Sequence, residues 1–211
     1  MPLDQFSQLV NSVEELTAVI GTPGPIALKK ELKSLDEHMR RFIAHSPFVV
    51  ISTHGSDGRC DASPRGDAPG FVHVVDEQTL LVPDRPGNRR VDSFRNILET
   101  GRVGLLFLVP GMGETLRVNG RAALVRDEAW LEPLSAQGKR PALAVAVEVE
   151  ECYLQCAKAL IRSKLWEPHV RPDLRSLPCA AGMLTDQVQM EEFDVDKMQT
   201  LLDGAYKNNL Y

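Results

Sequence analysis

The stretch LLVPDRPGNRRVDSFRN, residues 80–96, decides how this chain is organised. It runs from the end of an apolar strand, through a loop of Pro, Gly and Asn, into the start of a helix. Four arginines crowd it, although the formal net charge of the protein is −5. Basic side chains and free backbone N–H groups at a helix N-terminus favour a phosphate site. The alternative is a solvent-exposed basic turn whose positive charge is balanced by Asp84 and Asp92.

Composition limits the class of protein. With 211 residues, 43% of them apolar, we expect one domain with a real core, residues 1–211. Its expected parts are N-terminal helices at 12–46, a barrel core at 47–151 and a helical segment at 152–211. The negative net charge disfavours binding to nucleic acid or to an anionic membrane.

The cellular location is predicted from membrane-span, secretion-signal and disulfide patterns that the sequence lacks. No apolar run approaches the ~18 residues of a membrane span. The first residues, MPLDQFSQLV, lack the basic segment and apolar core of a secretion signal. Four scattered cysteines do not form a disulfide framework. These patterns predict a cytoplasmic protein with reduced thiols.

Two helices are expected before the first strand. The capping-box pattern SVEE at 12–15 predicts a short helix that ends near Gly21. A longer helix is predicted from Ile26 up to Pro47, because apolar residues recur on one face at 28, 32, 35, 39 and 42.

Short strands and turns follow. Strands are predicted at 48–53, up to Ser63, at 71–76 and 79–83, at 102–109 (buried on both faces), at 115–125 and at 142–151. Helices are predicted at 91–100, 157–166 and 194–203, with three prolines preventing long elements between the last two. Close spacing and hairpin connections indicate a mainly β fold, an antiparallel barrel with helical decorations.

A second loop, SPRGDAPGF at 63–71, is rigid and polar. Its Pro and Gly residues allow close approach of the backbone, and Arg65 could contact a planar polar ligand. The alternative is a surface turn in which Arg65 pairs with Asp67.

Other chemistry is weakly indicated. The histidines have no metal-ligand spacing and no nucleophile elbow is present, so no metal site and no catalytic residues are predicted. GxxxxGK[ST] and GxGxxG are also absent, which excludes a P-loop and a dinucleotide-binding fold. Redox chemistry on a bound cofactor is therefore the more natural hypothesis.

Four motifs in order carry a family resemblance: SPRGDxPGF, PDRPGNRRxDSxxNI, RVGLLFLVPGxxETLRVNGRA and CAKALIRSxLW. The chain resembles the pyridoxamine 5'-phosphate oxidase-like FMN-binding family, and within it a subgroup of probable FMN-dependent enzymes of unassigned substrate. The match covers about residues 12–166. It implies a split antiparallel β-barrel of the FMN-binding type, a homodimer with FMN between subunits, and oxidoreductase chemistry on a small molecule.

The resemblance also implies site residues. Those expected against the ring and ribityl chain are Ser63, Arg65, Gly66 and Asp67, with Pro83 and Asp84 at the ring edge. Those expected on the phosphate are Asn88, Arg89 and Arg90. Leu116 and Arg117 would contact the flavin from the side, and the partner wall would include Lys158, Arg162, Ser163 and Trp166.

The sequence departs from the subgroup at one position. Gln155 stands where a histidine is usual before the CAKA segment, which leaves room for a non-catalytic flavin-binding or sensing protein. The same fold with a deazaflavin or haem is a further alternative. Vitamin B6 oxidation is not inherited, because the C-terminal substrate segment of those oxidases has no match here.

Overall fold

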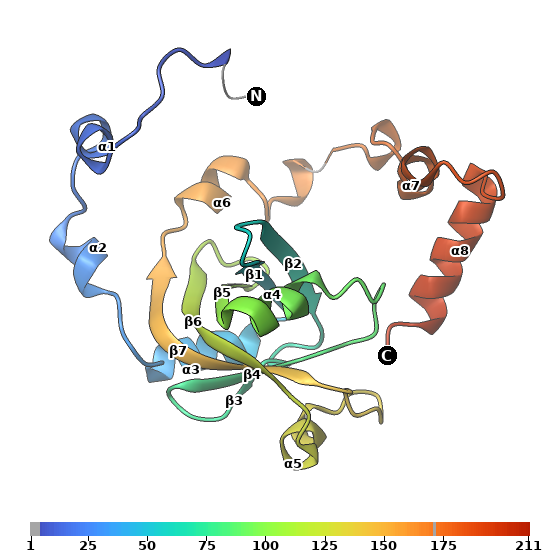
Figure 1. Cartoon of the computed structure of the whole chain (residues 1–211), viewed down its shortest axis with the longest axis horizontal. Helices are drawn as coiled ribbons and strands as arrows, with labels where there is room; N and C mark the ends of the chain where they lie inside the picture. The colour runs from blue at the N-terminus through green and yellow to red at the C-terminus, as the bar shows by residue number, and fades with distance from the viewer. Residues whose placement is uncertain (1–4, 171) are drawn as a thin grey trace.

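A computed structural model of the chain describes residues 5–170 and 172–211. Its centre is a seven-stranded sheet in the order β2-β1-β5-β6-β7-β4-β3, with every neighbouring pair antiparallel (Figure 1). The strands are β1 (Phe48–His54), β2 (Cys60–Gly66), β3 (His73–Val74), β4 (Thr79–Pro83), β5 (Arg102–Leu108), β6 (Thr115–Val125) and β7 (Ala144–Gln155). Among the described residues the edge strands β2 and β3 do not pair, so the sheet is not closed.

Both predicted hairpins form, although β3 covers only His73–Val74 of the strand predicted at 71–76. β1 and β2 pair across a turn in which Gly58 has φ 81°, and β3 pairs with β4. β5 differs from its prediction, because only alternate residues are fully buried and its other face is half-buried. β5 lies between β1 and β6 in the sheet, and Leu106 and Leu108 on its other face are only partly buried.

The core lies between the sheet and the helices packed on it. Phe107, Ile51, Leu80 and Val118 are fully buried there. α4 (Asp92–Thr100) packs on β1 and contributes Phe94 to this core. It ends at Gly101, whose φ of 62° is the left-handed conformation predicted for a helix stop.

The long helix predicted from Ile26 to Pro47 is wrong. The chain forms α2 (Pro25–Lys29), an extended stretch, and then α3 (Glu37–His45). In the extended stretch Leu32 exchanges backbone hydrogen bonds with Cys152 of β7. Asp36 then accepts a hydrogen bond from the Met39 amide at 2.8 Å, which starts α3 anew. Of the apolar positions in the predicted period, Leu35 and Met39 are buried, whereas Leu28 and Leu32 are exposed.

Two arms extend from this body on opposite sides (Figure 1). The N-terminal arm carries α1 (Val13–Ile20), bounded by Ser12 and Gly21 as predicted, and α2. The C-terminal part holds α6 (Lys158–Ser163), α7 (Ala180–Val188), which was not predicted, and α8 (Val195–Asn208). Short elements complete the chain: α5 (Glu128–Leu131), η2 (Glu132–Leu134), η3 (Pro168–Val170) and η4 (Leu174–Ser176).

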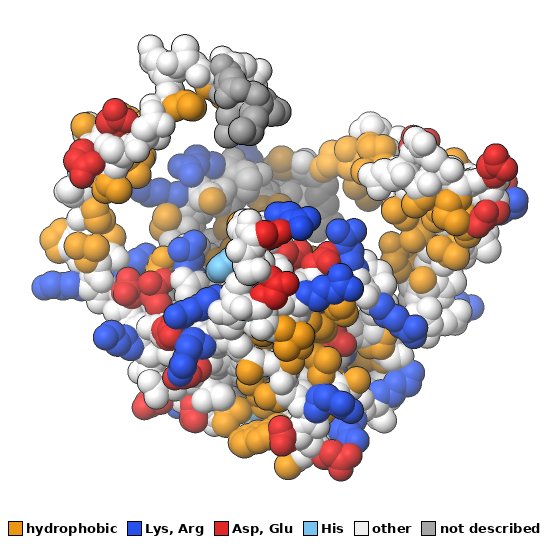
Figure 2. All heavy atoms as spheres, viewed as in Figure 1, with side chains coloured by type: hydrophobic (Ala, Val, Ile, Leu, Met, Phe, Trp, Pro, Cys, Tyr) orange, Lys and Arg blue, Asp and Glu red, His pale blue; other side chains and the backbone are white. Residues whose placement is uncertain are grey.

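Both arms expose apolar side chains (Figure 2). Neither α1 nor α2 buries a residue, and Ile26 is 84% exposed. Within residues 5–170 and 172–211, no helix combines the length and the apolar character that crossing a membrane requires.

Candidate functional site

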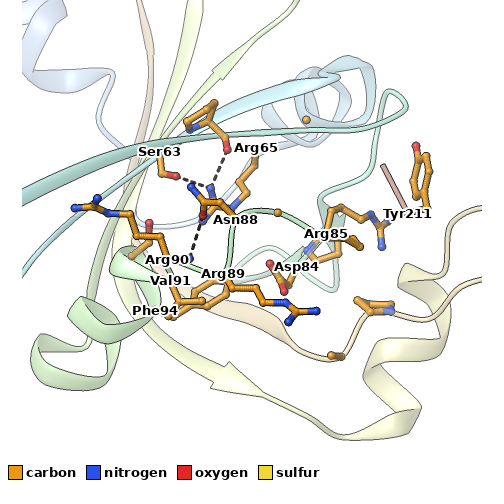
Figure 3. Close-up of a pocket in the computed structure, with 18 of the residues that line it drawn as sticks. Ser63, Arg65, Asp84, Arg85, Asn88, Arg89, Arg90, Val91, Phe94 and Tyr211 are labelled. Atoms are coloured by element: carbon orange, nitrogen blue, oxygen red, sulfur yellow. Dashed lines mark hydrogen bonds between the residues drawn. The ribbon is translucent and has the colours of Figure 1, made fainter. Parts of the chain in front are cut away.

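A cavity of about 920 Å³ lies where the loop after β4 faces the end of β2 (Figure 3). Its walls come from β2, from residues 83–94, from residues 139–142 and from Asn209 and Tyr211. A volume of this size is in the range of cofactor and small-molecule sites. The stretch 80–96 therefore forms much of one wall.

Arg65 lies at one end of the cavity, close to Ser63, Asn88 and Arg90 (Figure 3). Its Nη1 donates to Ser63 Oγ at 2.6 Å and to the Pro64 carbonyl at 2.8 Å. Its guanidinium also lies over the Phe94 ring, 5.8 Å from the centroid. Burial lowers the pKa of Arg65, and the negative charges of Asp84 and Asp61 partly offset this effect. The guanidinium stays cationic.

The Arg65–Asp67 pair considered from the sequence does not form. Asp67 pairs instead with Arg85, with 2.6 Å between Oδ2 and Nε, and the side chains of Arg85 and Asp67 are only 16% and 4% exposed. Arg85 also donates from Nη2 to the Leu134 carbonyl at 2.9 Å. Burial favours a higher pKa for Asp67, but hydrogen bonds from Tyr211, Ala68 and Arg85 outweigh it and leave the pKa below its ordinary value.

Asp84 lies in the middle of the cavity wall, between Arg65 and Arg85 in Figure 3. Burial raises the pKa of its carboxyl, and the positive charges of these two arginines only partly offset that effect. Among the described residues no Lys, Arg or His nitrogen lies within 4.0 Å of this carboxylate. Asp84 is thus a half-buried carboxyl group that faces the cavity. The nearby arginine charges only partly offset the effect of its burial.

The residues predicted for the phosphate have existing partners. The Arg90 amide donates to Asn88 Oδ1 at 3.0 Å, and the exposed Arg90 side chain forms an ion pair with Asp92. Arg89 and Val91 have positive φ values, 59° and 54°, which turn the chain sharply into α4. The Asp92 pairing is the one anticipated in the alternative interpretation of this loop.

The predicted site residues fall into two groups. Those that line the cavity are Ser63, Arg65, Gly66, Pro83, Asp84, Asn88, Arg89 and Arg90, with Asp67 directly behind them. Those outside it are Leu116, Arg117, Lys158, Arg162, Ser163 and Trp166. The Leu116 side chain is fully buried in the core, and Arg117 donates to the Tyr153 hydroxyl at 2.9 Å. The flavin contacts of both groups stay a prediction.

Sequence reasoning missed the wall formed by Lys139, Arg140, Asn209 and Tyr211. The adjacent charges in KRP, 139–141, were a signal that could have marked the first two. Nothing local marks Tyr211, because it reaches the cavity through a contact with Asp67, 144 residues earlier in the chain.

Comparisons with known proteins agree with the resemblance seen in the sequence. A family model described as pyridoxamine 5'-phosphate oxidase matches residues 35–156. This match confirms the family resemblance and the fold class, a mainly β split barrel with helical decorations. A search of curated proteins found no match.

Solved structures of low identity share part of the fold. HupZ of Group A Streptococcus is 17% identical, with a TM-score of 0.48, over 58% of this chain and 94% of its own. An FMN-binding protein from Syntrophomonas wolfei is 14% identical, with a TM-score of 0.42, over 54% and 80%. HutZ, a heme storage protein from Vibrio cholerae, is 14% identical, with a TM-score of 0.40, over 58% and 94%. At these values the likeness assigns no function.

Proposed function

Because the chain belongs to the pyridoxamine 5'-phosphate oxidase family, we propose that it binds FMN in this cavity and is an FMN-dependent oxidoreductase acting on a small molecule. The observation that carries the proposal is the state of Arg65. It is a half-buried cation on the cavity wall, and both of its hydrogen bonds use Nη1. Among the described residues no carboxylate lies within 4.0 Å of it, so Nε and Nη2 are available to an anion.

A phosphate is the anion that suits this end of the cavity. Arg65 supplies a planar guanidinium, Asn88 an amide, and the start of α4 lies beside them. Arg89 and Arg90 add positive charge at the rim, and Arg90 can exchange its exposed partner Asp92 for the ligand. We therefore keep Asn88, Arg89 and Arg90 as proposed phosphate contacts. We add Arg65, which the resemblance had placed against the flavin ring.

The protein's part in the chemistry is to bind and orient. A bound flavin supplies hydride and electron transfer, which none of the side chains here can perform. Phe71 and Pro83 give apolar surface to the cavity wall. Burial raises the pKa of Asp84, so this carboxyl loses its proton at a higher pH than an ordinary one.

We also propose a homodimer with the cavity completed by the partner. Helices α1 and α2 bury no residue in one chain, which leaves an apolar arm exposed (Figure 2). Lys158, Arg162, Ser163 and Trp166 lie outside the cavity of their own chain, so only a partner copy could present them to it. Light scattering on the protein as it elutes from a size-exclusion column should give twice the mass of one chain. A monomer with full FMN affinity would contradict this proposal.

Titration with FMN tests cofactor binding. Purified protein should be yellow, or should take up added FMN with a change in its fluorescence. Arg65→Ala should weaken binding by about 10- to 100-fold, the effect of one lost charge-assisted contact. Arg89→Ala combined with Arg90→Ala should also weaken it. Arg59→Ala is the matched control, because Arg59 lies on the same hairpin, is exposed and pairs with Asp57 away from the cavity. Equal affinity for Arg65→Ala and Arg59→Ala would refute the phosphate site.

A non-catalytic flavin-binding or sensing protein is the second candidate. Gln155 replaces the histidine usual in the subgroup, and its side-chain amide lies 3.3 Å from Thr115 Oγ1, outside the cavity. Stopped-flow reduction by NADH or NADPH, followed by reoxidation with oxygen or quinones, separates the two candidates. The absorption spectrum of the extracted cofactor separates FMN from a deazaflavin or haem.

A further inference from the structure

Tyr211 is held at the cavity although it lies far from the other lining residues in the sequence. The arm of α7 and α8 runs outward from the sheet and then returns, so that the C-terminus lies beside the loop that follows β4 (Figure 1). Asn209 and Tyr211 are the residues of this return that line the cavity.

Four residues fix the position of this tail, and we refer to Asp67, Arg85, Lys139 and Tyr211 as the tail latch. The Tyr211 hydroxyl donates to Asp67 Oδ1 at 2.6 Å. Lys139 Nζ donates to the Tyr211 backbone oxygen, also at 2.6 Å. Arg85 holds the other oxygen of Asp67 at 2.6 Å. The tail is therefore attached at both its side chain and its backbone.

The latch ties the C-terminal tail to three segments that border the cavity. Asp67 follows β2, Arg85 follows β4 and Lys139 precedes β7. Because Arg85 holds the mostly buried Asp67 carboxylate in place, that carboxylate is a rigid acceptor for the Tyr211 hydroxyl. A hydroxyl that donates to an ionised carboxylate makes one of the stronger hydrogen bonds found in proteins.

Tyr211 and Arg65 stand at opposite ends of the cavity. Figure 3 shows Ser63, Arg65, Asn88 and Arg90 together on one side, and Arg85 and Tyr211 on the other. A ligand anchored by a phosphate at Arg65 would extend toward the tail latch.

We propose that Tyr211 is a specificity-determining wall of this site: it closes the end opposite Arg65, so that only compact small molecules reach the bound ligand. This inference rests on the FMN binding proposed above. It adds that the tail selects what meets the flavin, and that the selection depends on the hydroxyl of Tyr211 as well as on its ring.

Hydrogen exchange without FMN tests the latch by itself. Tyr211→Phe removes only the hydroxyl, and we expect several-fold faster exchange in the peptide that covers 205–211. Tyr206→Phe is the matched control, because Tyr206 lies on the same arm and is 61% exposed. Its hydroxyl makes no hydrogen bond within the described part of the chain. Unchanged exchange in Tyr211→Phe would overturn the proposal.

Quenching of bound FMN fluorescence by iodide then tests the wall. We expect the quenching constant to rise at least about twofold in Tyr211→Ala and less in Tyr211→Phe, with Tyr206→Ala equal to wild type. These changes preserve charge, so altered attraction of iodide cannot explain a rise. Unchanged quenching in Tyr211→Ala that still binds FMN would refute the role of Tyr211 as a wall. The proposed FMN binding would stand. A wild-type chain that binds no FMN in the preceding titration would refute the proposed function, and with it the wall, while the exchange result would still report on the latch.

Discussion

The guanidinium of Arg85 lies 2.6 Å from the carboxylate of Asp67, and the two side chains are 16% and 4% exposed. This pair joins the loop after β2 to the loop after β4, both of which border the cavity. We expect Arg85→Ala to lower the free energy of unfolding by about 3 kcal/mol, because it leaves a buried carboxylate without its partner. Urea unfolding measures this loss. Arg59→Ala, which breaks an exposed pair, should change it little.

Acid should remove the contribution of Asp67. Its pKa is below the ordinary value in the folded protein, so its stabilisation is complete above the unfolded pKa and is lost as the pH falls through the folded pKa. The difference in unfolding free energy between wild type and Arg85→Ala should therefore shrink as the pH falls below the ordinary carboxyl pKa of about 4. A difference that stays constant over this range would assign the loss to packing of the Arg85 side chain.

Asp84 should behave in the opposite way. Its pKa is raised in the folded protein by burial, so its ionised form destabilises the fold at neutral pH and this cost disappears as the pH falls through the folded pKa. We expect Asp84→Asn to raise the melting temperature at pH 7, with the gain vanishing below the ordinary carboxyl pKa of about 4. Calorimetry at pH 7 and pH 3.5 measures both effects. A variant that is less stable than wild type at pH 7 would contradict this prediction.

The strands were predictable because their signals are local. β6 was placed at 115–125 from alternation, and the stop at Gly101 from the residue type alone. The break between α2 and α3 was not predictable, because it depends on Leu32 pairing with Cys152 across 120 residues. The loop with Arg65 and Asn88 was found from its charges, whereas Tyr211 was missed because its role comes from a tertiary contact.

At Gly120 strand β6 has no room for a side chain, and the alternating sequence pattern does not reveal this. The register of β6 with β7 shifts between Asn119 and Gly120, and a Cβ at Gly120 would lie 1.9 Å from the Glu148 carbonyl oxygen. We expect Gly120→Ala to lower the free energy of unfolding by about 1–3 kcal/mol or more, because backbone must move. Gly204→Ala is the control. A Cβ there meets nothing within 4 Å, so this change inside α8 should stabilise by up to about 1 kcal/mol. Equal effects in urea unfolding would contradict the assignment.

Cys152 should be the one protected thiol. It is fully buried, with Sγ 3.2 Å from the Ser34 carbonyl oxygen, and burial raises its pKa to about 11. At pH 8 only about one in a thousand of its side chains would be thiolate, the reactive form. Cys60, Cys156 and Cys179 are exposed. A thiol titration at pH 8 should therefore count three groups in the native protein and four in urea. Rapid labelling of Cys152 in native protein, located by peptide mass, would show that the contact between β7 and the stretch before α3 opens readily. That contact is what divides the predicted long helix, so the same measurement tests why the helix is broken.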